Sequence, residues 1–182
     1  MPDDEISVLG AGSWGTALAI RLAINHNHTL LWGHEPEFMA RLAAARQNSE
    51  FLPGIDFPDR LIIEADLQQA LTHSRDILVV VPSHAFREVL TSAIPFLQTH
   101  SRIAWATKGL EHGSGKFMSE VLYEVLGNDI PAAVLSGPTF AMEVAASLPT
   151  ALTVASNDAE FAARMARRLH GDVMRVYTSD DV

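Results

Sequence analysis

Short apolar runs alternate along the chain with stretches in which apolar residues recur at helical spacing. The runs that predict strands lie at 6–9, 28–33, 61–65, 76–82, 102–107, 132–137, 149–156 and 172–178. The stretches that predict helices lie at 14–24, 35–47, 66–74, 84–97, 115–127 and 157–171. Such alternation predicts an α/β fold with a doubly wound, mostly parallel sheet.

Local signals support several of these boundaries. Pro36 falls in the first turn of its predicted helix, where proline is tolerated. Asp66 is suited to cap the helix that follows it, and Asn157 and Gly171 bracket the last predicted helix. The run DILVVVP at 76–82 is unbroken, which is typical of a strand covered on both faces.

Composition narrows the class of protein. The chain has 182 residues, of which 48% are hydrophobic, so we expect one domain, 1–182, with a substantial core. Thirteen basic and 22 acidic residues give a net charge of −9, which argues against nucleic acid as a partner. The start MPDDEISVLG lacks the basic and apolar regions of a signal peptide, and no run is long enough for a membrane span, so we expect a cytoplasmic protein.

The stretch VLGAGSWGTALA places Gly10, Gly12 and Gly15 in the spacing G-x-G-x-x-G between a predicted strand and a predicted helix. In a dinucleotide-binding loop the first glycine permits the tight turn and the second admits the pyrophosphate. The third allows close packing of helix on strand. We interpret the stretch as a dinucleotide site; the alternative is a plain strand–helix turn that needs glycines.

The second predicted strand bears on the choice between NAD and NADP. An acid at its tip would hold the ribose hydroxyls of NAD, but the strand ends Trp-Gly-His, and Glu35 comes slightly late. His34, with nearby Arg41 or Arg46, offers partners for a 2′-phosphate. The pattern slightly favours NADPH over NADH; the alternative for His34 is an exposed loop histidine.

Three further strands end in polar or glycine residues, in VVVPSHAFREVL, WATKGLE and LSGPTFAMEVA. Because the carboxyl ends of parallel strands share one edge of a sheet, we expect these segments to converge on the glycine loop. Lys108 offers a compact cation to an anionic substrate; the alternative is an exposed surface lysine. Pro82 is expected at the nicotinamide, and Phe86 either there or in the core. We interpret Arg87 and Lys116 as surface charges, the alternative being clamps for a phosphate. We interpret His26 and His28 as loop residues because they lack partners for a metal.

Five segments, in this order and spacing, resemble the N-terminal half of bacterial-type NAD(P)-dependent glycerol-3-phosphate dehydrogenases: GAGSWGTALA, NSEFLPGI, VVPSHAFR, ATKGLE and LSGPTFAMEVAASLPTA. The resemblance implies a Rossmann-type cofactor domain in an enzyme that reduces dihydroxyacetone phosphate to sn-glycerol 3-phosphate for glycerophospholipid synthesis. It also implies site roles, which are cofactor contacts from Ser13, Trp14, His34 and Ala141, contacts to both cofactor and substrate from Lys108, and substrate contacts from Gly137 and Thr139.

The resemblance further implies a helical second domain beyond residue 182, which would hold the proton-transfer lysine, close the cleft and form a homodimer. Reduction of a ketone leaves an alkoxide that a positioned acid must protonate. We therefore expect these residues to bind NAD(P)H but to catalyse poorly or not at all alone, and to expose apolar surface where the second domain docks. Two alternatives are a non-catalytic dinucleotide-binding module and a related 3-hydroxy acid dehydrogenase.

Overall fold

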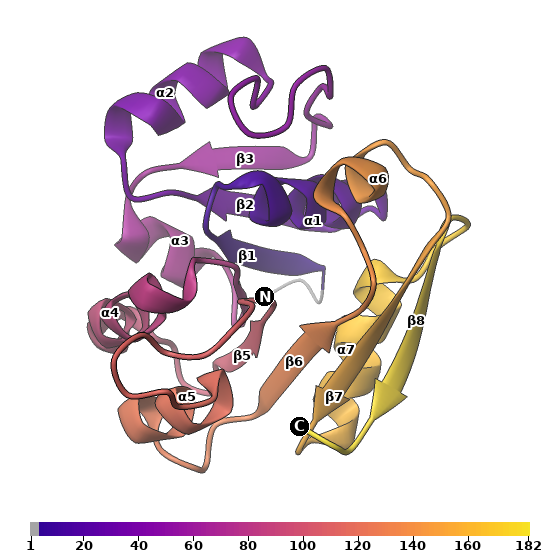
Figure 1. Cartoon of the computed structure of the whole chain (residues 1–182). Coiled ribbons are helices and arrows are strands. Elements are labelled where there is room, and N and C mark those ends of the chain that lie inside the picture. Colours follow the sequence, from indigo (N-terminus) through magenta and orange to yellow (C-terminus); the bar gives the residue numbers. More distant parts are fainter. Residues whose placement is uncertain (1–3) are drawn as a thin grey trace.

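The computed structural model describes residues 4–182, so Met1, Pro2 and Asp3 of the predicted domain lie outside the described residues. It contains one eight-stranded sheet in the order β3-β2-β1-β4-β5-β6-β7-β8 (Figure 1). The strands are β1 (Glu5–Leu9), β2 (His28–Trp32), β3 (Leu61–Glu64), β4 (Asp76–Val79), β5 (Arg102–Trp105), β6 (Ala132–Ser136), β7 (Thr150–Ser156) and β8 (Met174–Ser179). The predicted doubly wound, mostly parallel sheet is confirmed.

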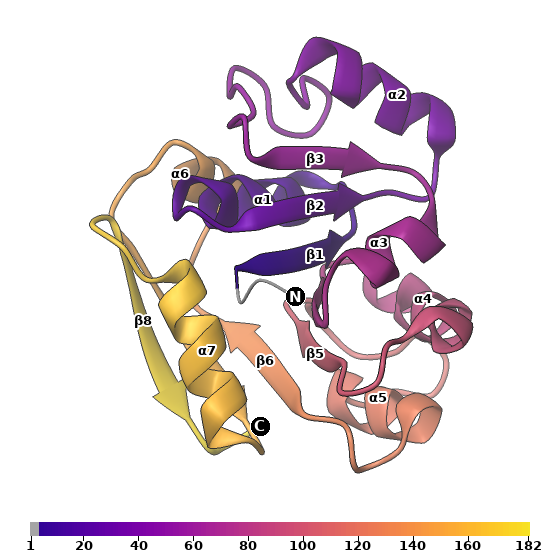
Figure 2. The same cartoon turned by 180° about the vertical axis from the view of Figure 1, so that it is seen from behind.

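Helices cover both faces of this sheet (Figures 1 and 2). They are α1 (Ser13–Ile24), α2 (Pro36–Ala45), α3 (Leu67–His73), α4 (Ser83–Ala93), α5 (Met118–Leu126), α6 (Ala141–Ala145) and α7 (Ala159–Leu169). One core joins buried residues of α1, α2, α6 and α7, and the other joins those of α3, α4 and α5. Neighbouring positions of a strand alternate between the cores: Leu78 of β4 enters the first, and Ile77 and Val79 enter the second.

The strand order reverses beside β1. From β1 the chain runs outward through β2 to β3, and it then returns to place β4 on the other side of β1. Ligands of open α/β sheets bind in the crevice outside the carboxyl ends of the strands at such a switch point. The loop after β1 lies at this point, so the topology places the glycine loop where a ligand site is expected.

The last third of the sheet departs from the parallel pattern. β7 pairs antiparallel with β6, and β8 then pairs parallel with β7. The short helix α6, which lies in the LSGPTFAMEVA segment, was not predicted from the sequence. Residues 137–149 hold only this helix and no crossover across the sheet, so β7 starts at the edge where β6 ends.

Some predicted helix ends differ from the structure. The helix predicted at 84–97 ends at Ala93 and continues as a 3₁₀ turn, Ile94–Phe96, because Pro95 has no N–H to donate. The helix predicted from residue 115 begins at Met118, since Gly115 has a φ of 69°. Asp66 caps α3 as predicted, but α7 is capped by Asp158 rather than Asn157. No helix within residues 4–182 is long and apolar enough to cross a membrane.

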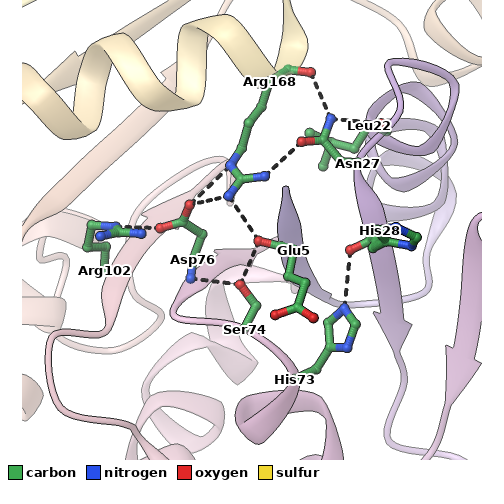
Figure 3. Close-up of polar contacts among 9 residues, drawn as sticks. All are labelled: Glu5, Leu22, Asn27, His28, His73, Ser74, Asp76, Arg102 and Arg168. Atoms are coloured by element: carbon green, nitrogen blue, oxygen red, sulfur yellow. Dashed lines mark hydrogen bonds and ion pairs between the residues drawn. The ribbon is translucent and has the colours of Figure 1, made fainter. Parts of the chain in front are cut away.

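A buried ion-pair network ties α7 to the amino edge of the sheet (Figure 3). The carboxylate of Asp76, the first residue of β4, accepts from Arg102 of β5 and from Arg168 of α7, the latter at 2.6 and 3.0 Å. Arg168 also donates to the Asn27 side chain at 2.7 Å and to the Glu5 carbonyl at 2.9 Å. The network lies at the edge of the sheet opposite to the glycine loop. We therefore interpret it as a structural support that joins elements of the fold.

Candidate functional site

The glycine loop joins β1 to α1, and its three glycines meet different surroundings. Gly10 has a φ of 123°, and a Cβ there would overlap the Val80 carbonyl; a Cβ on Gly15 would overlap the Gly10 carbonyl. Gly12 has ordinary extended backbone, and a Cβ there would meet nothing within 4 Å. Gly10 and Gly15 therefore serve the packing of the turn, whereas Gly12 borders open space.

The first turn of α1 begins directly after Gly12, at the border of that space. Gly12 is the N-cap, no side chain in the described part of the chain caps the helix there, and the first turn holds no acid. The uncapped N–H groups and the positive end of the helix dipole favour a bound anion. The loop is thus built as an anion cradle.

Asn48 braces the loop from behind, and it was not identified from the sequence. Its side chain is fully buried and donates to the Ala11 carbonyl at 3.0 Å and to the Thr16 hydroxyl at 2.9 Å, while it accepts from the Phe51 amide at 3.2 Å. Its segment, NSEFLPGI, is one of the five that carry the family resemblance, but the sequence assigned Asn48 no role. A buried amide in a loop before a distant strand carries no periodic signal that would have indicated this contact.

A cavity of about 1020 Å³ opens over the carboxyl ends of the strands. Its walls come from the loop after β1, the ends of β2, β4 and β5, one face of α4, and the segment after β6. Gly10, Gly12, Ser13, Trp14, His34, Lys108, Thr139 and Ala141 line it. The predicted convergence of strand ends on the glycine loop is therefore seen. Gly15 and Gly137 are not among the lining residues, and a Cβ on Gly137 would press on the Ala151 carbonyl.

Lys108 and Trp14 meet across this cavity. The Lys108 ammonium lies 5.5 Å from the centroid of the Trp14 ring, within the range of a cation–π contact. The preceding residue, Thr107, is buried and donates to the Val81 carbonyl at 2.9 Å, which fixes the end of β5 beside that of β4. The ammonium is thus held beside the glycine loop.

The Thr139 hydroxyl is a buried donor with no partner within residues 4–182. The residue is 5% exposed and lines the cavity. A buried hydroxyl left without a hydrogen bond costs about 1–3 kcal/mol, so a water or a ligand that reaches Thr139 in the cavity gains a hydrogen bond there. Thr139 follows β6, on the side of the cavity away from β2.

The β2 side of the cavity carries charges of both signs. His34 and Arg41 line it, but so do Glu35, within 3.5 Å of the His34 ring, and Glu50, within 4.0 Å of Arg41. Arg46 does not reach the cavity. It follows the last residue of α2 with a φ of 51°, and its guanidinium donates to the carbonyls of Pro58 and Leu61 at 2.6 and 2.8 Å, so the proposed contact from Arg46 to a 2′-phosphate is not supported.

Other predicted residues divide between cavity, core and surface. Pro82 lines the cavity, and Phe86 is fully buried in the core, which was the second of its two interpretations. Arg87 and Lys116 are partly exposed and do not line the cavity, as their interpretation as surface charges implies, and both are paired with acids. Arg87 donates to the Glu111 carboxylate at 2.6 and 3.0 Å and to Glu124 at 2.7 Å, and Lys116 pairs with Glu124.

Hydrogen bonds and ion pairs in this cluster shift the pKa values of Arg87, Glu111 and Glu124. Hydrogen bonds from Arg87 and then Ser114 hold the pKa of Glu111 down to about 2, and Glu111 and Glu124 raise the pKa of Arg87. Lys116 and Arg87 likewise lower the pKa of Glu124. Within residues 4–182 no group of three or more His, Asp or Glu side chains is placed to hold a metal ion.

Comparisons with known proteins identify the family. A family model described as NAD-dependent glycerol-3-phosphate dehydrogenase N-terminus matches residues 5–162. The chain is 56% identical over 180 residues to a glycerol-3-phosphate dehydrogenase [NAD(P)+] of Vibrio parahaemolyticus, a match that covers 98% of this chain and 52% of that protein. It is likewise 56% identical over 178 residues to the enzyme of Actinobacillus pleuropneumoniae, over 97% of this chain and 53% of that protein. The chain thus spans about half the length of the curated relatives it matches.

Solved structures agree with this result. The crystal structure of glycerol-3-phosphate dehydrogenase from Coxiella burnetii superposes with a TM-score of 0.94 at 46% identity, and the match covers 98% of this chain and 55% of that one. The family model spans the glycine loop, the cavity and the strand ends that form it. The chain therefore belongs to the family of N-terminal regions of NAD-dependent glycerol-3-phosphate dehydrogenases.

Proposed function

We propose that this chain binds NADH or NADPH in the cavity over the strand ends. The observation that carries the proposal is the open space at Gly12, in front of the uncapped N-terminus of α1 at the switch point of the sheet. A pyrophosphate fits that cradle because it accepts hydrogen bonds from the free N–H groups and interacts favourably with the helix dipole. The cavity volume of about 1020 Å³ suits an extended dinucleotide.

Each lining residue then has a role. Ser13 and Trp14 contact the cofactor at the loop, Ala141 contacts it from the segment after β6, and His34 contacts the adenosine end beside Arg41. With Glu35 slightly beyond the tip of β2, we propose a slight preference for NADPH. The acids Glu35 and Glu50 oppose this preference, which keeps it small.

We further propose that the parent enzyme reduces dihydroxyacetone phosphate to sn-glycerol 3-phosphate. When bound, the reduced nicotinamide supplies the hydride. The Lys108 ammonium contacts the nucleotide and attracts the anionic substrate to the nicotinamide. The unpartnered Thr139 hydroxyl donates to, or accepts from, a substrate oxygen, and Gly137 shapes the backbone beside it. The names of the relatives favour this reaction over that of a 3-hydroxy acid dehydrogenase and over a non-catalytic module.

The remaining half of the parent protein completes the site in this proposal. Phe140 is 71% exposed and Phe51 46% exposed, and both line the cavity, so a helical second domain has apolar side chains to cover. That domain supplies the proton-transfer lysine and the contacts of a homodimer. We place the enzyme in the cytoplasm, in the synthesis of glycerophospholipids, on the family resemblance alone.

Titration with NADPH and NADH, followed by nucleotide fluorescence, tests the binding proposal. We expect saturable binding of both nucleotides to the 182-residue chain. A Gly12→Ala variant should fold normally, because its Cβ meets nothing and its backbone suits alanine, yet bind at least about tenfold more weakly, a loss of about 1.4 kcal/mol.

A Gly15→Ala variant is the contrast, since its Cβ overlaps the Gly10 carbonyl and should disturb folding itself. Absence of binding by the folded wild-type chain would refute the proposal. Equal nucleotide affinity of the wild-type and Gly12→Ala chains would show that the space at Gly12 is not where the pyrophosphate binds.

A further inference from the structure

The loop that carries Lys108 is poorly suited to hold itself in place. Residues 108–116 lie in the connection between β5 and α5 and include Gly109, Gly113 and Gly115, all with φ between 69° and 89°. Two backbone hydrogen bonds close its distal part, from the Glu111 amide to the Lys116 carbonyl and from the Gly115 amide to the Glu111 carbonyl. Glycine-rich loops lose much conformational freedom when ordered, so an external anchor matters here.

Glu111 fastens the half of this loop that follows Lys108, whereas Lys116, at the other end of the loop, pairs with Glu124 of α5. Gly109 has no side chain, and Leu110 is 48% exposed, so neither holds the segment directly after Lys108. The Glu111 side chain, in contrast, is 13% exposed. It accepts two hydrogen bonds from Arg87 of α4, at 2.6 and 3.0 Å, and one from Ser114 at 2.5 Å.

Arg87 comes from an element that also forms the cavity. Other residues of α4, among them His84 and Glu88, line the cavity, whereas Arg87 does not. Its guanidinium bridges Glu111 to Glu124 of α5, so it joins the loop to two helices at once. A bidentate arginine–carboxylate pair fixes the orientation of the carboxylate as well as its distance from the guanidinium, which a single contact to an ammonium does not.

We propose that Arg87 is a positioning residue for Lys108. Acting through Glu111, it holds the loop so that the Lys108 ammonium stays in the cavity, 5.5 Å from the Trp14 ring. Arg87 touches neither nucleotide nor substrate in this account. The inference rests on the proposed function, because it assigns Arg87 an effect on ligands through a residue of the proposed site.

A double-mutant cycle on NADPH affinity tests this coupling. Lys108→Met, Arg87→Met and the double variant are titrated with NADPH beside the wild-type chain. Residues in one network show coupling that distant sites lack. We expect each single change to weaken binding, Arg87→Met by about threefold to tenfold. In the Lys108→Met background, Arg87→Met should have no further effect.

Thermal unfolding separates this role from general stabilisation. Arg87→Met should lower the unfolding midpoint equally in the wild-type and the Lys108→Met backgrounds, because loss of the ion pairs does not depend on the Lys108 side chain. Arg87→Lys keeps the charge but loses the bidentate contact, so it should recover only part of the affinity. Arg167→Met, at an exposed arginine of α7, is the matched control and should leave affinity unchanged.

Each result decides the inference. The inference is overturned if Arg87→Met weakens NADPH affinity equally in both backgrounds, or does not change it at all. It is also overturned if Lys108→Met leaves NADPH affinity unchanged. In each of these cases NADPH binding by the wild-type chain still stands. Failure of the folded wild-type chain to bind NADPH would overturn the proposed function and this inference with it.

Discussion

At the scale of single residues, the site contains groups that form no side-chain hydrogen bond or packing contact which would stabilise the described part of the folded chain. The Thr139 hydroxyl is buried without a partner within residues 4–182, and Gly12 faces open space. Gly10 and Gly15, by contrast, are needed by the turn. Thr139 and Gly12 are therefore the positions where binding and stability can be separated by mutation.

Replacement of Thr139 by valine should show this separation. Valine keeps the shape of threonine and removes the unpaired hydroxyl, so we expect the free energy of unfolding to rise by about 1 kcal/mol. We also expect sn-glycerol 3-phosphate to stabilise the NADPH-saturated variant less than the wild-type chain. Urea unfolding with and without the ligand measures both effects, and a less stable variant would contradict the unpaired state of the hydroxyl.

The Glu111 carboxylate should make stability depend on pH. Its pKa is lowered to about 2 by Arg87 and Ser114. A group with a depressed pKa in the folded state stabilises the fold above its unfolded pKa, near 4.5, and loses that contribution as pH falls toward 2. Lys116 and Glu124 lie in the same cluster, and Glu124 should act in the same direction.

Glu111→Gln isolates this contribution. The urea midpoint of the wild-type chain should exceed that of the variant by a constant amount from about pH 7 to about pH 5, and the difference should shrink between about pH 4.5 and about pH 2. A difference that persists unchanged at the acid end of this range would argue against ionisation of Glu111 as its cause.

At the scale of elements, a buried ion-pair network holds together the amino edge of the sheet, opposite to the carboxyl edge where we propose that the nucleotide binds. Asp76 joins β4 to β5 and α7 through Arg102 and Arg168 (Figure 3). Removal of one member of a buried ion-pair network leaves the other charges uncompensated. The network explains how α7, which follows an antiparallel strand, is fixed to the parallel part of the sheet.

Replacement of Asp76 by alanine should therefore be costly. We expect the free energy of unfolding to fall by about 3 kcal/mol, with NADPH affinity unchanged as long as the chain is folded. Denaturant unfolding measures the first effect and nucleotide titration the second. Asp59→Ala, at an exposed aspartate, serves as the control and should change stability by less than about 0.5 kcal/mol. An equal fall in the free energy of unfolding of the two variants would show that the network does not stabilise the fold.

The elements themselves were largely predictable, because apolar runs and glycine or proline boundaries identify them locally. The exceptions share a cause. α6 spans five residues, too few for helical periodicity to appear. β7 pairs antiparallel with β6 because the short connection between them does not cross the sheet, so β7 starts at the edge where β6 ends. Pairing direction is decided by tertiary structure, so the apolar pattern of 149–156 indicated a strand without its orientation.

At the scale of the whole molecule, the sequence predicted which strand ends form the cavity, but not the residues that brace the loops around it. Strand–loop–helix context identified the glycine loop, and the shared edge of parallel strands placed Lys108 and Thr139 near it. Asn48 and the Arg87–Glu111 pair escaped prediction, because a buried side chain that braces a loop distant in sequence leaves no local pattern. Arg46 was assigned to the site from its proximity in sequence, but its guanidinium is used within the fold.

Turnover is the prediction that belongs to the whole molecule. The chain spans about half the length of its curated relatives. With NADPH and dihydroxyacetone phosphate we expect little or no loss of reduced nicotinamide, since the proposed proton-transfer lysine belongs to the other half. Rapid oxidation would mean that these residues hold every group needed, and a Lys108→Met variant would then show whether Lys108 supplies the proton.

The most direct test of the central claim is to map where NADPH binds this chain. Backbone amide resonances recorded during a titration with NADPH report each residue separately. We predict saturable shifts that are largest at the amides of residues 12–15 and extend to Lys108 and Ala141, with little change around Asp76. Shifts that centre on the amino edge of the sheet, or an absence of saturable shifts, would contradict the account.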